Sequence, residues 1–417
     1  MMVKGVVVIL DGVADEPCRV LGEKTPLEYA KTPNLDWFAS KSELRHCFPI
    51  AEGVAPQSSS GIVSLFGEDY KKTSRGFLEA LGAGVKLNDG DLALRCNFAT
   101  IDNLKDFNLI DRRAGRTLTT NEANLLGKAI NEKVKLPYKF EFISTIGHRA
   151  VLVFRGLFSD NFSNVDPDYE DGVSVKSYDN IRLSFPYDDS SASKLASDLV
   201  NTFVQKSFVV LDNHPINIMR RKKGLYPANF ILCRDPGAKK LNFRKLEGKW
   251  LCFGYMPLEI GFGLSFGMDV KSFKYPELKN IDSYETLNLA LKTAIKNAKN
   301  YLKEFSNEYD YFYIHFKETD LPGHDNKPIE KVKLIEMIDK DFFSFLKEFI
   351  DNKECKLLVT SDHTTSSRAK RHTDNPVPVM FYDSKSIRDK NNRFTEKEGL
   401  FGKQYLAKKL LKETIFS

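Results

Sequence analysis

The chain has 417 residues, of which 42% are hydrophobic and 28% are charged, and its formal net charge at pH 7 is +6. This length and composition are typical of a globular protein with enough apolar residues for two domain cores. The mild positive charge is compatible with a small anionic substrate, but it is not concentrated into the basic face of a nucleic-acid-binding protein, so we expect no nucleic-acid partner.

The cysteines and the first residues indicate where the protein works. Six cysteines are scattered without a CxxC spacing, which favours neither a disulfide framework nor a zinc knuckle. The apolar run in MMVKGVVVIL is too short to span a membrane, and it ends at Asp11 rather than at a small-residue cleavage site. We therefore expect a cytoplasmic protein with reduced thiols and no membrane partner. No feature indicates an oligomer, although one is possible.

The first predicted element is a strand at residues 3–10. Its continuous β-branched run is typical of a strand that is buried on both faces of a parallel sheet, and Asp11 follows its carboxyl end. A helix is predicted over residues 25–40, with a start signal at Thr32-Pro33. The alternation of strands and helices predicts an α/β fold with a mainly parallel sheet flanked by helices.

Three consecutive serines, Ser58 to Ser60, lie where a loop meets the next predicted helix (EGVAPQSSSGIVSLFG). A serine at a helix N-terminus commonly caps the free backbone N–H groups. The same position suits a nucleophile that accepts a phosphoryl group, because the free amides and the helix dipole stabilise an anion there. Position alone does not separate the cap from the nucleophile.

A further helix is predicted over residues 73–87, and from about residue 89 to 223 the pattern changes to short strands and turns. This region includes a predicted helix at about 191–205 and a predicted strand at 208–211 (FVVL). Its DRRAGR stretch places Arg112, Arg113 and Arg116 close together. Such a cluster is usually a solvated face, but arginine also suits bidentate binding of phosphate and carboxylate, so both interpretations stay open. The RRKK run at 220–223 is interpreted as a solvated turn.

Alternation of strands and helices resumes near residue 226. The predicted elements are the strands PANFILCR and GKWLCFGYM, a turn at 261–267, a helix at about 284–305, the strand YFYIHF, a helix at about 328–352, the strands KLLVTS and PVPVMFY, and a lysine-rich C-terminal helix. The helix at 328–352 carries a core-facing stripe that begins at Ile329 and ends at Phe349. His46 and His315 are interpreted as strand histidines.

Side chains of the metal-ligand type follow the ends of several predicted strands, where ligands bind in open α/β sheets. The residues predicted to hold one divalent ion are Asp320, His324 and His372, and those predicted to hold a second are Asp11, Asp362, His363 and a serine oxygen. Two ions about 4 Å apart can activate a hydroxyl and clamp the attacking and leaving oxygens of an in-line phosphoryl transfer.

A series of stretches between about residue 9 and residue 380 carries a resemblance to a known family. They are LDG, PQSSSGIVSLFG, GFLEALGAG, RCNFATID, DRRAGR, HPIN with PANFILCR, TDLPGHD, SDHTT and HTDNPVPV. In this order they resemble the cofactor-independent phosphoglycerate mutases of the archaeal type, within the alkaline phosphatase superfamily. TDLPGHD and SDH mark the superfamily, whereas RCNFAT and DRRAGR mark the mutase branch.

The resemblance implies a role for each candidate residue. Ser58, nine residues before Gly67, would be the phosphorylated nucleophile and would also ligate the second metal ion. The substrate would be gripped by Arg112, Arg113, Arg116 and, from the hinge side, Arg234. The fold would be an alkaline-phosphatase-like core of residues 1–85 and 228–417, with a smaller α/β substrate-binding domain inserted at residues 86–227.

The implied reaction is the interconversion of 3-phosphoglycerate and 2-phosphoglycerate in glycolysis and gluconeogenesis, through a phosphoserine. It would use two divalent ions, with Mn²⁺ favoured and Zn²⁺, Co²⁺ or Mg²⁺ as alternatives, and no bisphosphoglycerate. The chain departs from the family pattern at Gln57-Ser58-Ser59, which has no acid after the serine, and at Asp235, where a glycine often follows the hinge arginine.

Two rival interpretations are retained. One is another metal-dependent phosphatase, phosphomutase or phosphonate hydrolase of the same superfamily. The other is a metal-binding but catalytically silent protein, whose expected signature is a missing ligand; no predicted ligand is missing from this sequence.

Overall fold

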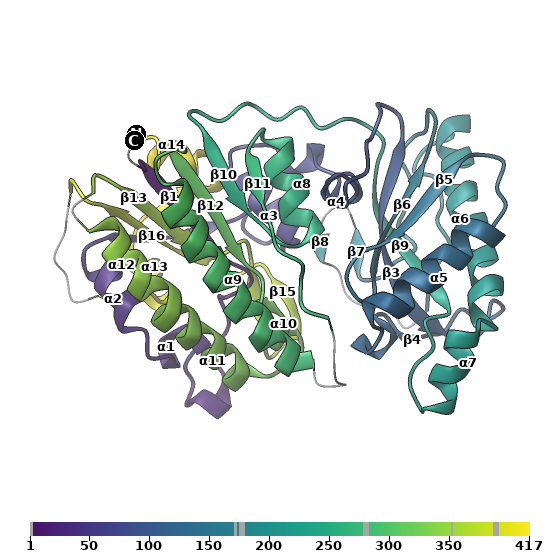
Figure 1. Ribbon diagram of the computed structural model, residues 1–417, viewed down its shortest axis with the longest axis horizontal. Coiled ribbons are helices and arrows are strands. Elements are labelled where there is room, and N and C mark those ends of the chain that lie inside the picture. The colour runs from purple at the N-terminus through teal and green to yellow at the C-terminus, as the bar shows by residue number, and fades with distance from the viewer. Residues whose placement is uncertain (1–2, 171–172, 175–179, 278–282, 352, 387–391) are drawn as a thin grey trace.

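The computed structural model describes residues 3–170, 173–174, 180–277, 283–351, 353–386 and 392–417. Two sheets dominate this part of the chain, the larger with eight strands and the smaller with five. Figure 1 shows them at opposite ends of an elongated molecule, with both termini beside the larger sheet. The α/β fold class predicted from the sequence, including the smaller second α/β unit, is confirmed.

The larger sheet is mainly parallel. In order across the sheet, its strands are β11 (Asp269–Lys271), β10 (Trp250–Phe253), β12 (Tyr311–Phe316), β1 (Gly5–Leu10), β13 (Lys356–Thr360), β16 (Val377–Asp383), β2 (Glu43–Phe48) and β17 (Gln404–Leu406). Among these described strands, only β16 runs antiparallel to its neighbours. The sheet therefore presents most of its carboxyl strand ends at one edge.

The burial of the central strand β1 accounts for its continuous apolar sequence. All six of its residues are buried, and alternate side chains enter the two different hydrophobic cores on either side of the sheet. It is parallel to both β12 and β13, with Leu10 opposite Phe316 and Ile9 opposite Thr360. Because these three strands end in register, the residues that follow them meet at the same place.

Helices cover both faces of this sheet. One face packs against α1 (Pro26–Tyr29), α2 (Pro33–Ser40), α9 (Ser283–Phe305) and α11 (Pro328–Ile338), which continues through a π-helical turn (Asp339–Phe343) into α12 (Ser344–Ile350). The other face packs against α3 (Ser58–Leu65), α8 (Pro257–Ser265) and α14 (Leu410–Glu413). The predicted helix at 328–352 is confirmed, but Ile329 in its first turn is 49% exposed and is not a core residue.

The smaller sheet is antiparallel and has its own hydrophobic core. Its long buried strand β3 (Leu92–Ile101) pairs with β9 (Phe230–Gly237), with β6 (Arg149–Phe154) and with β4 (Leu109–Asp111), and β6 also pairs with β5 (Phe140–Ser144). One face is covered by α5 (Thr120–Lys133) and α6 (Ser191–Asp212), and α7 (Pro215–Lys222) follows α6. On the other face lies α4 (Arg75–Gly82), between the two sheets in Figure 1.

The strand pairing bears on the predicted division of the chain. The sequence-based boundary at residue 228 assigned the strand PANFILCR to the core, whereas β9 pairs with β3 in the smaller sheet. Phe230 and Ile231 accordingly pack in the hydrophobic core of that sheet. A continuous apolar run in the sequence does not reveal which sheet the strand joins. A strand that is buried on both faces has this composition in a parallel sheet and in the centre of an antiparallel one.

Two predicted elements were wrong in type. The predicted strand at 208–211 belongs to α6, where Leu211 is buried and Val209 is 67% exposed, as on an amphipathic helix. The predicted turn at 261–267 is largely the helix α8. Its Gly261 has a packing role, because a Cβ there would lie 1.8 Å from the Leu78 carbonyl oxygen of α4.

The RRKK run is only partly the solvated turn that was predicted: Arg221, Lys222 and Lys223 are exposed, but they lie at the end of α7 rather than in a turn. Arg220 is a buried residue of α7. Its guanidinium donates hydrogen bonds to the carbonyl oxygens of Ala114, Thr117 and Tyr226 at 2.9–3.2 Å. Arg220 therefore fixes the loop that carries the DRRAGR arginines.

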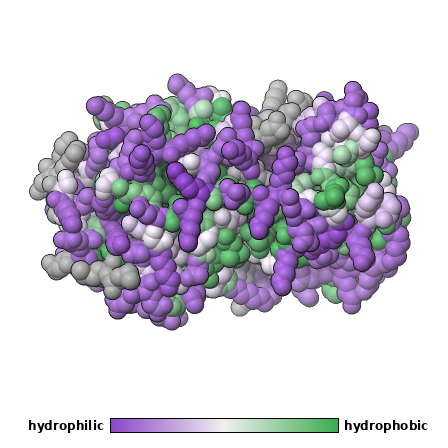
Figure 2. Space-filling view, turned by 90° about the horizontal axis from the view of Figure 1, so that it is seen from above, coloured by the Kyte–Doolittle hydropathy of each residue, from purple (hydrophilic) through white to green (hydrophobic). Residues whose placement is uncertain are grey.

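The face of the molecule shown in Figure 2 is largely hydrophilic. Figure 2 shows hydrophilic residues over most of the face that it presents, with smaller groups of hydrophobic residues between them. Among the helices of the described residues, none is long and apolar enough to cross a membrane.

Candidate metal centre and the arginines that face it

Three neighbouring strands carry the candidate site to one edge of the larger sheet. Asp11 follows β1, Lys317 follows β12, and Asp362 comes two residues after the end of β13. The shared register of these strands brings the three residues together, although more than 300 positions separate Asp11 from the others. Asp362 Oδ1 accepts a hydrogen bond from the Gly12 N–H at 3.1 Å, which joins the ends of β1 and β13 directly.

The first predicted ligand set comes together around Asp320. Asp320 and His324 lie on α10 (Asp320–His324), where a spacing of four residues places both side chains on one helical face. His372 reaches them from β15 (Arg371–Thr373). His324 Nε2 lies 3.4 Å from Asp320 Oδ2 and 3.2 Å from His372 Nε2, and His372 Nε2 lies 3.6 Å from Asp320 Oδ1.

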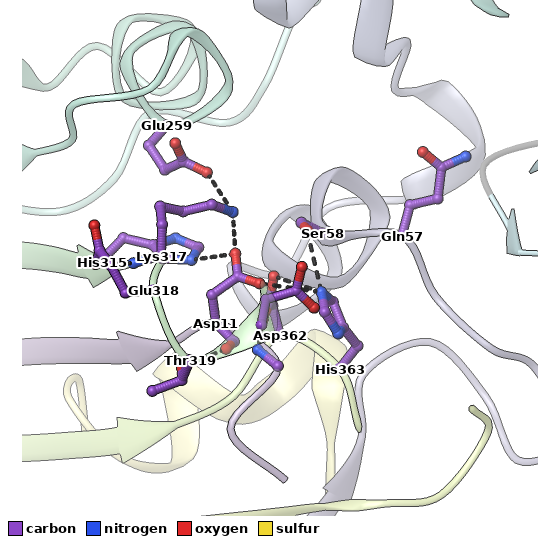
Figure 3. Close-up of polar contacts among 12 residues, drawn as sticks. Asp11, Gln57, Ser58, Glu259, His315, Lys317, Glu318, Thr319, Asp362 and His363 are labelled. Carbon is purple, nitrogen blue, oxygen red and sulfur yellow. Dashed lines mark hydrogen bonds and ion pairs between the residues drawn. The ribbon is translucent and has the colours of Figure 1, made fainter. Parts of the chain in front are cut away.

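The second predicted set comes together around His363. Its Nε2 lies 3.4 Å from Asp11 Oδ1, 3.3 Å from Asp362 Oδ2 and 3.1 Å from Ser58 Oγ. All four of these residues are buried (Figure 3). The rings of His363 and His372 stack with their centroids 3.6 Å apart, so the two sets lie side by side.

The hydrogen bonds assign the same tautomer to all three histidines. Nδ1–H of His324 donates to the Lys370 carbonyl oxygen at 3.1 Å, and that of His372 donates to the Pro56 carbonyl oxygen at 2.8 Å. Nδ1–H of His363 donates to Thr365 Oγ1 at 2.9 Å, whose own hydroxyl donates to Asp320 Oδ1 at 2.7 Å. In the neutral ring, the proton is therefore on Nδ1 and Nε2 keeps the lone pair that turns toward the other ligands, as in metal-ligating histidines.

This arrangement fits divalent ions. Two imidazole lone pairs at the 3.2 Å separation of His324 and His372 repel each other unless a cation or proton lies between them. Asp11 Oδ1 and Asp362 Oδ2 are buried carboxylate oxygens without a hydrogen-bond partner among the described residues. Imidazole and carboxylate together form the donor set of a transition-metal ion. The described residues thus include groups that could hold an ion, among them Asp320, His363 and His372, and Asp11, Asp362 and His363.

The two stacked imidazoles have opposite electrostatic surroundings. Burial and the neighbouring His363 lower the pKa of His372 to about 3. Burial also acts to lower the pKa of His363, but the carboxylates of Asp362, Asp11 and Asp320 outweigh it and raise that pKa to about 9. The excess of carboxylate charge therefore lies on the Asp11 and Asp362 side of the stack.

The structure separates the capping serine from the serine that faces this site. Ser60 Oγ accepts a hydrogen bond from the Gln57 N–H at 3.0 Å and donates to the Gln57 carbonyl oxygen, so Ser60 closes the start of α3. Ser58 is the first residue of α3, and its hydroxyl is directed at His363. Gly61 permits this approach, because a Cβ there would lie 2.1 Å from the Asp362 carbonyl oxygen. Ser58 is free of the capping task.

A cavity of about 220 Å³ lies between these residues and the smaller sheet. On one side it is lined by Ser58, Lys317, Asp320, His324 and His372. We call these residues, with the buried Asp11, Asp362 and His363, the metal wall. The opposite side, which we call the arginine wall, contains Arg75, Arg95, Arg112, Arg113, Arg116, Arg149 and Arg234. All four arginines singled out from the sequence are among them.

The arginines differ in how far their charge is already compensated. Arg112 donates to Asp166 at 2.5 Å, Arg95 pairs with Glu79 at 3.0 Å, and Arg116 forms an ion pair with Asp325. Arg234 lies 3.6 Å from Asp166 and stacks over the ring of Tyr169. These four are held in place by partners.

Arg113 and Arg149 are the exceptions. Neither has a described carboxylate within ion-pair distance, and both are packed inside the cavity wall. Burial and the neighbouring Arg116 and Arg112 lower the pKa of Arg113 to about 10, and burial lowers the pKa of Arg149. Their positive charge is therefore uncompensated and attracts an anionic ligand into the cavity.

The two departures from the family pattern lie against each other. Gln57 Nε2 donates to Asp235 Oδ1 at 3.2 Å. Gln57 Oε1 accepts from Arg234 at 3.3 Å and from Arg75 at 3.4 Å. The residue before Ser58 and the residue after the hinge arginine thus belong to one network that fixes two members of the arginine wall.

Sequence reasoning missed several residues of this site. It interpreted His315 only as a strand histidine, which is correct for its place in β12, but His315 Nε2 also lies 3.0 Å from Asp11 Oδ2. Lys317 and Glu259 were not singled out, and neither was Arg149. Lys317 could have been found, because it directly follows a strand whose neighbour ends at Asp11. Glu259 and Arg149 carry no such local signal.

Comparison with known proteins gives consistent results across almost the whole chain. The family model described as 2,3-bisphosphoglycerate-independent phosphoglycerate mutase matches residues 39–217. A curated protein of that name from Thermococcus kodakarensis is 38% identical over 407 residues, covering 96% of this chain and 93% of that protein. Another from Pyrococcus abyssi is 37% identical over 410 residues, covering 96% and 94%.

Solved structures share the fold over the same extent. A protein from Pyrococcus horikoshii aligns with a TM-score of 0.73 at 27% identity, covering 100% of this chain and 97% of that one. The cofactor-independent phosphoglycerate mutase from Thermoplasma acidophilum aligns with a TM-score of 0.58 at 26% identity, covering 100% and 99%. Both the larger and the smaller sheet are therefore parts of one known architecture.

Proposed function

The chain belongs to the family of 2,3-bisphosphoglycerate-independent phosphoglycerate mutases, and from this membership we propose that it interconverts 3-phosphoglycerate and 2-phosphoglycerate through a phosphoserine at Ser58. The reaction would serve glycolysis and gluconeogenesis and would need no bisphosphoglycerate. The placement of Ser58 carries the proposal. Its hydroxyl is relieved of capping by Ser60 and meets the ligand set of His363 at the mouth of an arginine-lined cavity.

Seven residues of the metal wall are proposed to hold two divalent ions. They are Asp320, His324 and His372 for one ion, and Asp11, Ser58, Asp362 and His363 for the other. The shared tautomer of the three histidines supports this assignment. When bound, the ions would supply the positive charge that lowers the pKa of the Ser58 hydroxyl and stabilises the transferring phosphoryl group. Histidine-rich ligation favours Mn²⁺, with Zn²⁺, Co²⁺ and Mg²⁺ as alternatives.

Ser58 is proposed to act as the nucleophile. Its Oγ forms a bond to phosphorus while the bond from phosphorus to the C3 oxygen of the glycerate breaks. The C2 hydroxyl of the same glycerate then attacks the phosphoserine, and the Ser58 oxygen leaves. The reverse sequence of steps converts 2-phosphoglycerate to 3-phosphoglycerate. In either direction the protein needs to hold the freed glycerate between the two phosphoryl transfers.

The arginine wall is proposed to hold that glycerate. Arg112, Arg113, Arg116 and Arg234 are the proposed substrate ligands, and Arg149, which like Arg113 has no described carboxylate within ion-pair distance, lines the same cavity. The planar guanidinium suits the carboxylate end of the substrate. A substrate that fills the cavity would displace water, which would otherwise attack the phosphoserine and release phosphate.

The strand pairing also suggests how the chain is divided into two units. We propose a core of residues 3–85 and 239–417 and an inserted substrate-binding unit of residues 86–238, because β9 belongs to the smaller sheet. The ion pair between Arg116 and Asp325 would then link the two units across the cavity. The six cysteines are all buried and free, which supports a reducing compartment such as the cytoplasm.

The test is a coupled assay of 3-phosphoglycerate conversion with added Mn²⁺ and without bisphosphoglycerate. Release of free phosphate is followed in the same samples. Formation of 2-phosphoglycerate well above phosphate release is the expected result. Phosphate release without 2-phosphoglycerate would instead identify a phosphatase of the same fold and would contradict the proposal.

A further inference from the structure

Beside the proposed two-metal centre lies a third group of cation ligands, and a lysine occupies it. Asp11, Glu259 and His315 offer ligand atoms within 4.8 Å of one another, and all three residues are buried. Lys317 Nζ forms ion pairs with Asp11 Oδ2 and, at 3.0 Å, with Glu259 Oε1. Figure 3 shows the ammonium between the two carboxylates, with the His315 ring beside it at the same oxygen of Asp11.

This group differs from the two metal-ligand sets in one respect. In those sets, the ligand atoms face one another without a charged side chain between them. In the third group, the position between the carboxylates is filled by a positive charge that belongs to the chain itself. We propose that Lys317 is a positioning residue whose ammonium takes the place of a third metal ion next to the two-metal centre.

Asp11 is the residue through which Lys317 acts. Its Oδ2 contacts both Lys317 and His315, the latter at 3.0 Å. Its Oδ1 has no hydrogen-bond partner among the described residues and lies 3.4 Å from His363 Nε2. Lys317 and His315 therefore fix the carboxylate so that one oxygen remains directed at the second metal set. This inference rests on the proposed metal centre.

The charges of the site agree with this role. Asp11, Glu259, Asp320 and Asp362 contribute four carboxylates, and an ionised Ser58 would add a fifth negative charge. Two divalent ions and one ammonium would balance these five charges, with the histidines neutral. Without Lys317, Asp11 and Glu259, both 0% exposed, would share a site with no positive charge between them. Such a pair either binds a cation or destabilises the fold.

Lys317 is placed beside Asp11 by regular secondary structure rather than by a long loop. It is the first residue after β12, at the same edge as Asp11, and its backbone N–H donates to Tyr255 Oη at 2.9 Å. Glu259 approaches from the first turn of α8, which Gly261 allows to pack tightly against α4. Lys317 and its second carboxylate partner, Glu259, are thus both held by packed secondary structure.

The test counts metal ions. Purified full-length protein and its variants are dialysed against Mn²⁺, and bound manganese per chain is measured by elemental analysis. The wild-type chain is expected to bind two ions. Lys317→Ala is expected to bind three, because removal of the ammonium leaves Asp11 and Glu259 facing an open site. Lys317→Ala combined with Glu259→Gln is expected to return to two ions.

Matched controls and a second readout separate this role from a merely structural one. Lys333→Ala, which removes an exposed lysine that pairs with Glu330, is expected to bind two ions. Mutase activity of Lys317→Ala is expected to be low at Mn²⁺ levels that saturate the wild type and to rise again at higher Mn²⁺. Recovery should be absent in the double variant.

The outcomes that would overturn the inference are distinct from those that would overturn the proposed function. A wild-type chain that binds no manganese contradicts the metal centre itself. A wild type with two ions and a Lys317→Ala variant that also binds two contradicts the role of Lys317 alone. Lys317→Ser serves as the second small variant, and failure of both to fold in excess Mn²⁺ also contradicts the inference, because the ion should then replace the ammonium.

Discussion

The two walls of the cavity are built from opposite charges and are stabilised in opposite ways. The metal wall gathers carboxylates and imidazoles whose remaining polar atoms are tied to backbone oxygens or to Thr365. The arginine wall gathers guanidinium groups, most of which are paired with carboxylates of the chain, such as Asp166 and Glu79. One wall leaves negative charge uncompensated, and the other leaves positive charge uncompensated at Arg113 and Arg149.

The difference shows what each wall requires from outside the chain. The metal wall is complete only when cations enter it, because two of its carboxylate oxygens have no hydrogen-bond partner among the described residues, and the Nε2 atoms of His324 and His372 face each other at 3.2 Å. The arginine wall is complete when an anion enters the cavity. In a metal-dependent enzyme that acts on a small phosphorylated acid, the bound metal ions supply the cations for the metal wall and the bound substrate supplies the anion for the arginine wall. The variants below test whether the two walls can be disturbed separately.

The largest effect is expected from Ser58→Ala. Loss of the nucleophile should reduce mutase turnover by at least about 10⁴-fold, because among the described residues Ser58 provides the hydroxyl that contacts His363 Nε2, whereas Thr365 contacts Nδ1. The arginine wall should remain intact, so binding of 3-phosphoglycerate should persist when measured by calorimetry. Ser60→Ala is the matched control, since it loses a cap and should cost stability while turnover continues.

The second effect is expected on the other wall. Arg113→Met should raise KM by about 10- to 100-fold, because a hydrogen bond to a charged group contributes about 1.5–3 kcal/mol. Manganese binding should be unchanged, which steady-state kinetics and metal analysis together would show. Arg155→Met removes an arginine that pairs with Asp91 and Glu141 away from the cavity, and it should leave KM unaltered. Equal KM values for both variants would remove Arg113 from the list of substrate ligands.

A smaller effect is expected where the two metal sets are joined. Thr365→Val removes the hydroxyl that links His363 Nδ1 to Asp320 Oδ1. Partners of this kind typically contribute about 10- to 100-fold to metal affinity. Manganese titration should show weaker binding, with KM for 3-phosphoglycerate close to that of the wild type at saturating metal. Thr365→Ser keeps the hydroxyl and should bind manganese normally; weak binding by the serine variant would point to lost packing instead.

The smallest effect concerns a half-buried carboxyl, that of Glu396, which faces neither wall. Burial raises the pKa of Glu396 from 4.5 to about 7. Asp166 behaves in the opposite way, because the neighbouring Arg112 and Arg234 outweigh the effect of burial and lower its pKa. The folded state therefore binds the Glu396 proton more tightly than the unfolded state, and stability falls as pH rises from 4.5 to about 7.

Glu396→Gln should remove that part of the pH dependence. The amide oxygen can still accept from the Asp15 N–H, and the amide NH2 group can donate to Thr25 Oγ1; the corresponding contacts of the wild-type carboxylate are 3.0 and 2.7 Å long. Urea unfolding at several pH values should show the variant gaining up to about 3 kcal/mol relative to the wild type between pH 4.5 and pH 8. Mutase turnover should not change. Parallel stability curves for the two proteins would contradict the assigned pKa.

The comparison also shows how far sequence reasoning reached. It predicted the strands β1, β12 and β13 and the ligands that follow them, because buried parallel strands have a continuous apolar pattern and their ends carry the chemistry. It left the choice between capping and catalysis at the serines undecided. That choice depends on which side chain Ser60 and Ser58 each meet, and His363 lies more than 300 residues away from them.

The remaining errors have a common physical cause. The type of α8 and the sheet to which β9 belongs depend on packing partners, such as the Leu78 carbonyl against Gly261 and the pairing of Ile231 with Phe98. The compensation of each arginine depends on carboxylates that are distant in sequence, such as Asp166 for Arg112. Local patterns carry no information about these contacts.

The sequence by itself determined the alternating α/β order, the candidate metal ligands and the arginine-rich loop, because each is written in the spacing and type of nearby residues. Only the tertiary structure decided which charges meet. It placed Lys317 between Asp11 and Glu259, left Arg113 and Arg149 without a described carboxylate, and directed Ser58 at His363. Electrostatic interactions depend on distance in space and on burial, and neither is fixed by distance along the chain.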